Sequence, residues 1–267
     1  MRNSTLLLKW FILPVLVLSL ALAGCDNDDD DDPDSNNNDN NNNEETEESA
    51  PTPTVGPNAD AALVSIKLYS VTSVPNVGDV EVETGLATAV FFDNGSTTLL
   101  LDAGEVTAED EMLTRNSNNS YTYVPGQPDM TNPSVTGIDF DNATNWEVAG
   151  SGEVDAFSTT HTDNWPQVGD LSAPATIDGS AEFTLSVTNI DDADSVIFHV
   201  SGPDGTLLVT KAGNATSHTF TAAEMGSIGT GAGIVQVAPY NYRSKSLVGL
   251  QVYLVKETVR SKSVTIE

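Results

Sequence analysis

Residues 181–210 read AEFTLSVTNIDDADSVIFHVSGPDGTLLVT, and this stretch decides the fold class. Apolar and polar residues alternate over 181–187, which is the period of a strand with one buried face. Residues 195–200 (SVIFHV) predict a second strand. In the turn at 202–205 (GPDG), Pro fixes φ and Gly tolerates a positive φ. The chain is therefore expected to return as a third strand over 206–210.

The rest of the C-terminal part continues this pattern. Short strands are expected at 217–221, 233–238, 247–256 and 262–267. A capping box, Thr221-Ala222-Ala223-Glu224, predicts one helical turn. About seven strands in fewer than a hundred residues resemble an immunoglobulin or fibronectin type III sandwich. The resemblance implies an all-β sandwich fold and carries no function.

The preceding part of the chain has the same period of two. Short runs rich in β-branched and aromatic residues are separated by turn residues, and no helical periodicity exceeds about one turn. The expected strands are 63–69, 81–83, 87–92, 98–101, 120–124 and 145–148. The sequence therefore predicts an all-β protein made of two small β-sandwich-like modules.

A composition shift marks a boundary between these modules. Residues 166–174 contain two Pro, a Gly and an Asp and are expected to form a linker, with Trp165 packing between the modules. Residues 61–170 carry 17 acidic and 2 basic residues, whereas residues 171–267 carry 9 and 6. We expect an acidic β module over 61–165, the linker over 166–174, and the immunoglobulin-like sandwich over 175–267.

The N-terminus has the features of a secretory signal peptide over residues 1–24. Arg2 and Lys9 form a positive n-region, and the 14 residues that follow are largely apolar, too few to span a bilayer. The stretch ends Leu22-Ala23-Gly24-Cys25 and resembles the lipobox of bacterial lipoproteins. That resemblance implies a lipid-modified Cys25, which is the only cysteine, as the first residue of the mature chain. The whole arrangement resembles bacterial envelope lipoproteins that carry small tandem β modules.

Residues 25–60 are expected to be the lipidated Cys25 followed by a disordered tether. Residues 26–60 hold 13 acidic residues, no basic or aromatic residue, and Val55 as the one large aliphatic residue. Such a segment cannot bury enough apolar surface to offset its chain entropy, and its charges repel one another. Asp26 is compatible with inner-membrane retention by one sorting rule and with surface export by another, so the leaflet stays open.

Charge and cysteine content exclude several classes of protein. The chain of 267 residues holds 39 acidic against 10 basic residues, a formal charge of −29. This balance argues against nucleic acid as a partner, because binding phosphates requires Lys and Arg. One cysteine excludes an intramolecular disulfide and a Cys-rich zinc site. No metal-ligand spacing of histidines and no nucleophile elbow is present, so no catalytic residue is assigned.

Two groups of residues are candidates for binding. Asp191, Asp192 and Asp194 lie in an expected loop and could supply carboxylates to a structural Ca²⁺, or they could form a solvated turn. Tyr240, Tyr242 and Arg243 follow Pro239 and are expected to form a loop with the residue types of a binding surface.

These observations favour an extracytoplasmic, lipid-anchored envelope protein without catalytic activity. Its partners are expected to be the membrane, through the lipid, and an envelope protein, a matrix component or a glycan. An envelope polymer hydrolase is one alternative, and a structural subunit of an envelope complex is another. A deep acidic cleft would favour the hydrolase, an exposed aromatic loop the binding protein, and a bare strand edge the structural subunit.

Overall fold

The computed structural model describes residues 53, 59–74, 78–93, 99–125 and 136–267, and the regular secondary structure of this part is nearly all β-strand. The one helix in this part of the chain is α1 (Ala222–Met225). The all-β, sandwich-like class predicted from the sequence is confirmed. The signal peptide, Cys25 and nearly all of the predicted tether lie outside the described residues. Within the described ranges, no helix is long and apolar enough to span a membrane.

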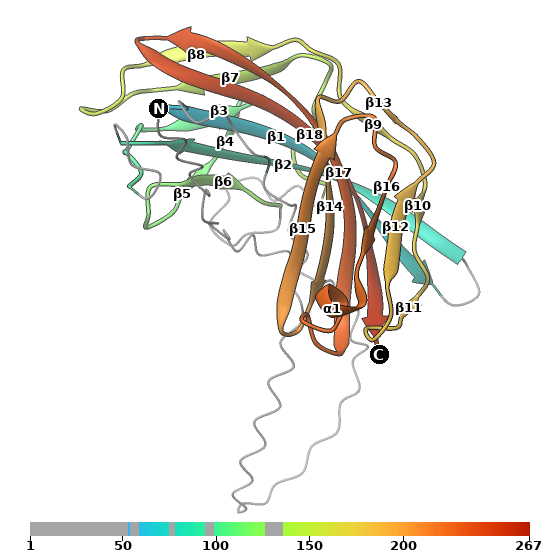
Figure 1. The fold of residues 1–267 in the computed structure, drawn as a ribbon. Coiled ribbons are helices and arrows are strands. Elements are labelled where there is room, and N and C mark those ends of the chain that lie inside the picture. Colours follow the sequence, from blue (N-terminus) through green and yellow to red (C-terminus); the bar gives the residue numbers. More distant parts are fainter. Residues whose placement is uncertain (1–52, 54–58, 75–77, 94–98, 126–135) are drawn as a thin grey trace, which may run out of the picture.

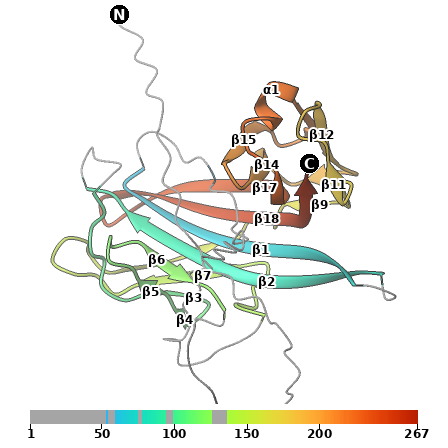
Figure 2. The same ribbon diagram turned by 90° about the horizontal axis from the view of Figure 1, so that it is seen from below.

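One nine-stranded sheet forms the frame of the molecule (Figures 1 and 2). In spatial order its strands are β15 (Gly205–Ala212), β14 (Ser195–Gly202), β17 (Gly231–Leu247), β18 (Leu250–Ile266), β1 (Ala61–Val74), β2 (Gly78–Phe91), β6 (Tyr121–Tyr123) and β5 (Thr114–Arg115). The ninth strand, β11 (Thr176–Ile177), pairs with the end of β18. β1 and β11 run parallel to β18, and all other neighbours are antiparallel.

Three smaller sheets complete the fold. A four-stranded sheet has the order β4 (Glu111–Met112), β3 (Val106–Ala108), β7 (Thr144–Val148) and β8 (Phe157–His161). A three-stranded sheet has the order β10 (Leu171–Ser172), β12 (Phe183–Val187) and β16 (Ser217–Phe220). The strands β9 (Gln167–Val168) and β13 (Ile190–Asp191) form a pair.

The central strands of the large sheet are buried on both faces, and three hydrophobic cores result. One core lies between the large sheet and the four-stranded sheet and includes Leu63 and Trp146. A second lies between the large sheet and the three-stranded sheet and includes Phe198 and Phe220. The third core, with Ile66 among its members, covers the opposite face of the large sheet. Alternate residues of β1 therefore enter the first and third cores, as the period of a strand requires.

The long hairpin β17–β18 belongs to both halves of the molecule. Val235 and Val264 contribute to the second core, whereas Leu247 and Val252 pack in or against the first. Each strand has 17 residues and so extends over roughly 55 Å. The expected separation into sequential modules differs from this arrangement, because one hairpin at the C-terminal end of the chain supplies both sandwiches.

The hairpin turn corrects one of the expected strands. Residues 247–256 were expected as one strand, but the chain turns at Val248 and Gly249, which have φ of 46° and 86°. Two central residues with positive φ form the turn type that matches strand twist, usually built from Asn-Gly or Asp-Gly. The Val-Gly pair lacks that signal, so the sequence pattern placed the turn too early, after Pro239.

The predicted helical turn agrees with the structure, whereas the strand expected over 98–101 is absent from its described residues 99–101, apart from a bridge at Leu100. The capping box at Thr221 is present: the Glu224 N–H donates to the Thr221 hydroxyl, and the Glu224 carboxylate accepts from the Thr221 N–H. At the start of the fold, the Asp60 N–H donates to the Gln251 carbonyl at 2.9 Å, and the Gln251 N–H donates to the Asp60 carboxylate at 2.7 Å. The last residue of the predicted tether is thus part of the folded structure.

Candidate functional site

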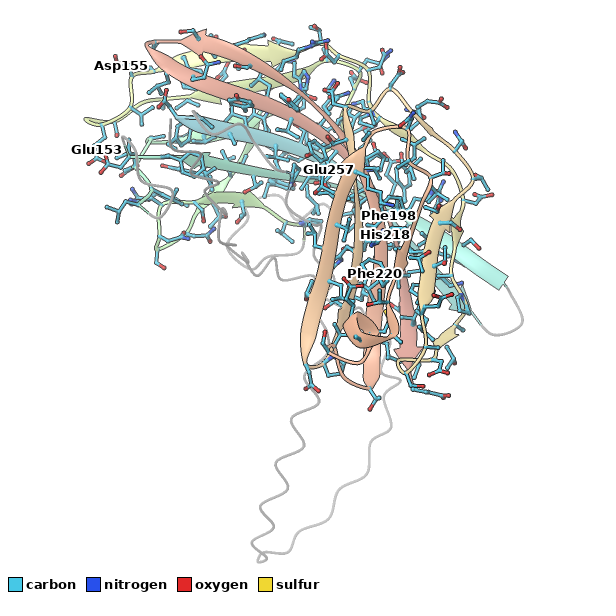
Figure 3. The ribbon with its side chains drawn as sticks, viewed as in Figure 1. Glu153, Asp155, Phe198, His218, Phe220 and Glu257 are labelled. Atoms are coloured by element: carbon cyan, nitrogen blue, oxygen red, sulfur yellow. The ribbon has the colours of Figure 1, made fainter. Side chains whose placement is uncertain are left out.

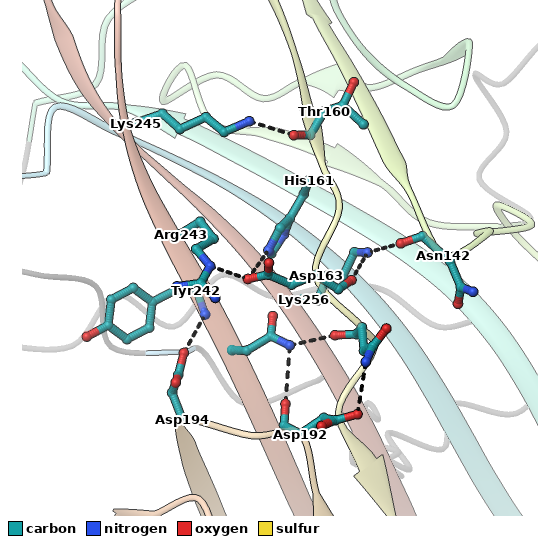
Figure 4. A network of polar contacts seen from close by, with 12 residues as sticks. Asn142, Thr160, His161, Asp163, Asp192, Asp194, Tyr242, Arg243, Lys245 and Lys256 are labelled. Carbon is teal, nitrogen blue, oxygen red and sulfur yellow. Dashed lines mark hydrogen bonds and ion pairs between the residues drawn. The ribbon is translucent and has the colours of Figure 1, made fainter.

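A polar network lies where the two halves of the molecule meet (Figure 4). Its residues come from the segment just before β7, from the end of β8 and the segment after it, from the loop between β13 and β14, and from β17 and β18. We call these twelve residues the junction network. They are Asn142, Thr160, His161, Asp163, Asn164, Asp192, Asp194, Asn241, Tyr242, Arg243, Lys245 and Lys256.

Asp163 is the centre of charge in the network. Arg243 Nε donates to Asp163 Oδ2 at 2.5 Å, and His161 Nε2 lies 3.5 Å from the same oxygen. His161 is 1% exposed, and burial lowers its pKa to about 4, with a further lowering from the positive charge of Lys256. The histidine is therefore neutral at pH 7, and Arg243 supplies the charge that balances Asp163.

The β13–β14 loop is tied to the network through Asn241. The buried Asn241 Nδ2 donates to the Asn164 carbonyl at 2.6 Å and the Asp192 carbonyl at 3.3 Å. Asn164 Nδ2 in turn donates to the Asp192 carboxylate at 3.3 Å. These bonds join three separate parts of the chain at one point.

The three candidate calcium ligands have separate roles in the structure. The Asp191 carboxylate accepts from Asn189 Nδ2 at 3.1 Å, and Asp192 has a left-handed backbone with φ of 56°. The Asp194 carboxylate accepts from the Tyr242 N–H at 3.1 Å. Across the ranges that the structure describes, no three His, Cys, Asp or Glu side chains gather as metal ligands. The calcium hypothesis therefore gains no support from this geometry.

The three candidate binding residues lie in a strand, not in the expected loop. Tyr240, Tyr242 and Arg243 are in the middle of β17, which continues through Pro239 because β18 pairs with it on both sides of the proline. Tyr240 is 2% exposed and belongs to the third core. Tyr242 is 40% exposed and packs against Tyr253 at 5.7 Å between ring centres. Of the three candidate residues, Tyr242 is thus the one exposed aromatic residue, and the half-buried Tyr253 lies beside it.

A row of basic side chains on β18 holds the segment that was expected to be a linker. Lys256, Arg260 and Lys262 occupy alternate positions and so point to one face. Lys256 Nζ donates to the carbonyls of Asn142 and Asp163, the latter at 2.7 Å. Arg260 donates to the Val168 carbonyl at 3.3 Å, and Lys262 to the Ala173 carbonyl at 2.9 Å.

Apart from the carbonyl of Asn142, the acceptors of these bonds lie within residues 163–173. The same segment forms β9 and β10. Trp165, expected to pack between the modules, is buried between Lys67 and Lys256, whose Nζ atoms lie 5.0 and 5.2 Å from its ring centre. Ammonium groups over an indole face are favourable, so the lysines and the ring stabilise one another. Its Nε1 also donates to the Asp141 carbonyl at 2.8 Å.

The network has the chemistry of a structural cross-link. Most of its side-chain hydrogen bonds are donated to backbone carbonyls. One of them is the bond from Lys245 Nζ to the Thr160 carbonyl, at 2.6 Å. Neither ring nitrogen of His161 has a hydrogen-bond partner, so among the described residues no hydroxyl is poised for activation by it.

Two further features lie outside the network. An open depression of about 720 Å³ lies at the end of the molecule that carries α1, and it is lined by residues that include Asp178, Ser180 and Glu267. Two hydrogen bonds from Ser180 lower the pKa of Asp178. Glu257 is fully buried near the centre of the large sheet, and His218 packs between Phe198 and Phe220 (Figure 3).

Sequence reasoning singled out part of this network and missed the rest. It considered Tyr242, Arg243, Asp192 and Asp194 but not their partners. Asp163 and Lys256 are separated by 93 residues, and nothing in their local patterns signals a contact. The available signal was the higher share of basic residues in the C-terminal part, and the structure places five of its six basic residues on β17 and β18.

Comparison with known protein families and with curated proteins finds no match to this chain.

Proposed function

We propose that this chain is a lipid-anchored cell-envelope protein with a non-catalytic role in display or interaction, facing the outside of the cytoplasmic membrane. One observation carries the proposal. The only cysteine, Cys25, ends the Leu-Ala-Gly-Cys stretch directly after a positive n-region and an apolar segment of signal-peptide length. Two or three acyl chains on this residue would hold the protein at a membrane, because each buried methylene contributes about 0.8 kcal/mol.

The place where the tether joins the fold supports a display role. Asp60 bonds to Gln251, next to the turn between β17 and β18. The helix α1 and the C-terminus lie toward the opposite end of this hairpin (Figure 1). An anchor at Cys25 would therefore hold the turn end through the acidic tether and leave the α1 end with its open depression farther from the bilayer.

An aromatic surface on the sheet supports the interaction role. The rings of Tyr242 and Tyr253 form a tilted pair on neighbouring strands, and the Tyr242 backbone is fixed by Asp194. Exposed tyrosines on a rigid strand bury large contact area at low conformational cost. The partner class proposed for this surface is an envelope protein, a matrix component or a glycan.

Anchoring is tested by metabolic labelling with an alkyne palmitate analogue in a bacterial host. Wild type and the matched control Gly24→Ala, which keeps a small residue before the cysteine, are expected to be labelled. Cys25→Ser is expected to lose the label and to leave the detergent-rich phase on Triton X-114 partition. Equal labelling of Cys25→Ser, or no label in wild type, would overturn the anchor.

Exposure is tested separately by protease shaving of intact cells, with blotting for the C-terminal residues. Loss of signal without permeabilisation places the folded part outside the cell and supports display to external ligands. Protection until permeabilisation places it in the periplasm, where envelope partners become the relevant class. Protection until the cytoplasmic membrane itself is lysed would contradict an envelope location.

A second candidate function, a structural subunit of an envelope assembly, is favoured by one observation. The strand β15 lies at the edge of the large sheet with β14 as its only hydrogen-bonded neighbour among the described strands.

A further inference from the structure

The edge strand β15 combines length, apolar character and exposure. It has eight residues, GTLLVTKA, and every one of them is partly or fully exposed. Its neighbour β14 is buried at six of its eight positions, which shows how a covered strand of this sheet differs. Figure 1 places β15 at the margin of the C-terminal half. An unpaired edge of this kind is a template for another strand.

The other sheet edges are shorter or carry charged side chains; the outer edge of β2, which β6 covers only over residues 87–89, carries Glu81 and Glu83. β5, β4 and β10 have two residues each, β16 has four and β8 has five. The part of β17 beyond β14 is bridged to β8 by Lys245 and to the following segment by Arg243. Folded proteins protect edges by these means. The strand β15 has one charge, Lys211, near its end, where Lys211 Nζ donates to the Ser217 carbonyl at 3.2 Å, and it has no charge over residues 205–210.

The hydrogen-bond pattern of the β14–β15 hairpin determines which backbone N–H and C=O groups of β15 could bond to a further strand. The Gly213 N–H donates to the Asp194 carbonyl at 3.1 Å, so the odd-numbered residues of this strand face β14. The N–H and C=O groups of Thr206, Leu208 and Thr210 therefore point away from the sheet. None of these groups has a hydrogen-bond partner on another described strand.

We propose that two copies of this chain associate through β15, as antiparallel strands with Leu208 opposite the partner's Leu208. A two-fold axis perpendicular to the sheet keeps each face on the same side in both copies, so residues of equal parity must lie opposite each other. This register satisfies that condition. It forms about six main-chain hydrogen bonds through the outward groups of Thr206, Leu208 and Thr210.

The side chains of β15 are self-complementary in this register. Leu208 meets the partner's Leu208, and Leu207 meets the partner's Val209, so apolar side chains lie opposite one another. Thr206 meets the partner's Thr210, a cross-strand pair that is favourable in antiparallel sheets. The strand holds one charge, Lys211, which faces the partner's Gly205 next to Asp204. No like charges are opposed, and a cation approaches an anion at each end.

This second-copy proposal is independent of the lipid anchor, because it rests on β14 and β15 alone. Partner strands from other envelope proteins are the competing occupants, and a test must separate them. Cross-linking of full-length protein on isolated membranes does so, because a homodimer has twice the mass of the chain. Cys25 is present in every variant, so any disulfide that it forms appears in wild type.

The first test uses the variant Thr206→Cys/Thr210→Cys. In the proposed register these positions are opposite each other at about 5.5 Å between Cα atoms, within the range of a disulfide. Mild oxidation is expected to give a reducible dimer. The single variants Thr206→Cys and Thr210→Cys each lack a partner thiol and are expected to give none. Equal dimer from the single variants, or none from the double variant, would overturn the register.

The second test reads association without new thiols. In Thr206→Lys/Thr210→Lys two lysines face two lysines across the axis, whereas in Thr206→Lys/Thr210→Glu each lysine faces a glutamate. We expect the first variant to weaken self-association by about tenfold and the second to preserve it, measured by sedimentation equilibrium of full-length protein in detergent. Circular dichroism checks that both variants fold. Equal masses for the two variants would refute pairing through β15.

Discussion

Lys256 and Glu257 are consecutive residues of β18, both are fully buried, and they point to opposite faces of the sheet. They are therefore not an ion pair. Lys256 meets two backbone carbonyls and the ring of Trp165. Neither carboxylate oxygen of Glu257 has a hydrogen-bond partner, and its neighbours across the sheet are Tyr240 and Ile66. One strand thus holds a partnered charge on one face and an unpartnered acid on the other.

The first prediction concerns Lys256. Burial lowers its pKa from 10.5 to about 8, so between these values the unfolded chain binds a proton that the folded chain has released. The free energy of unfolding contributed by this residue therefore rises with pH from about 8 to 10.5, by at most about 1.4 kcal/mol per pH unit. We expect wild type to gain stability relative to Lys256→Met across this range, measured by urea unfolding.

Lys262→Met is the matched control for that experiment. Lys262 lies on the same strand and face and also donates to a carbonyl, but it is half-buried and keeps access to water. Its loss removes a carbonyl bond of the same kind, so subtracting the Lys262→Met difference at each pH leaves the part that is particular to Lys256. A Lys256→Met difference that did not change with pH would contradict the lowered pKa.

The second prediction concerns Glu257 and has the opposite sign. Burial raises its pKa well above 4.5, so above pH 4.5 the unfolded chain loses a proton that the folded chain keeps. Stability contributed by this residue is complete below pH 4.5 and falls as pH rises toward the folded pKa, by at most about 1.4 kcal/mol per pH unit. Glu257→Gln, which resembles the protonated acid, is expected to gain on wild type from pH 5 upward in urea unfolding.

The pH at which the comparison is made decides this test. At pH 4 Glu257 is largely protonated in both the folded and the unfolded chain. The two proteins are therefore expected to differ there in free energy of unfolding by their packing alone. An advantage of Glu257→Gln that does not grow between pH 5 and 8 would mean that Glu257 is ionised in the fold. It would then need a counter-ion beyond the residues described above.

The local parts of this fold were predictable, and the long-range parts were not. The strand at 195–200 and the capping box at Thr221 follow from patterns of a few residues. The pairing of β1 with β18 joins residues almost 200 positions apart, and no local pattern encodes it. The continuous hairpin was hidden because Arg243 and Lys245 give β17 a polar, loop-like sequence. Their side chains in fact bridge to the segment after β8 and to β8 itself.

The candidate site was predictable to a similar extent. Tyr242 and Arg243 were identified by residue type, and the structure places both in the junction network. Their roles depend on Asp194 and Asp163, which approach them through tertiary structure. The linker assignment of residues 166–174 followed their Pro and Gly content, whereas the bases of β18 hold this segment against the sheet.

The third prediction concerns His199, which is 8% exposed in the interior of the sheet. Burial lowers its pKa from 6.5 to about 4, so between these values the unfolded chain takes up a proton that the fold excludes. Stability contributed by neutral His199 is complete above pH 6.5 and is lost as pH falls toward 4. His199→Gln is expected to reduce this acid-dependent loss by at most about 1.4 kcal/mol per pH unit, measured by urea unfolding.

His161 provides an internal comparison for that result. Its pKa is also lowered to about 4, but Asp163 lies 3.5 Å away and favours the protonated form, whereas Lys256 opposes it. The double variant His161→Gln/His199→Gln is expected to be less acid-sensitive than either single variant. If neither single variant changed the slope below pH 6.5, the carboxylates would account for the acid response.

The last prediction concerns the close approach of Gly85 in β2 to Gly137. The Gly85 N–H donates to Thr136 O at 2.9 Å, and the Ile138 N–H donates to Gly85 O at 3.1 Å. A Cβ at Gly85 would lie 1.8 Å from the Ile138 carbonyl oxygen, which is backbone and cannot rotate away. Gly85→Ala is therefore expected to lower the free energy of unfolding by about 3 kcal/mol or more.

Gly152→Ala is the matched control, because a Cβ there meets no atom within 4 Å and the residue does not have a positive φ. Its effect is expected to stay within about 0.5 kcal/mol. Both variants are compared by urea unfolding at pH 7, where the midpoint and the slope are fitted together. Equal stability of the two variants would mean that residues 136–138 do not lie against β2 in solution, and the first core would then be open on that side.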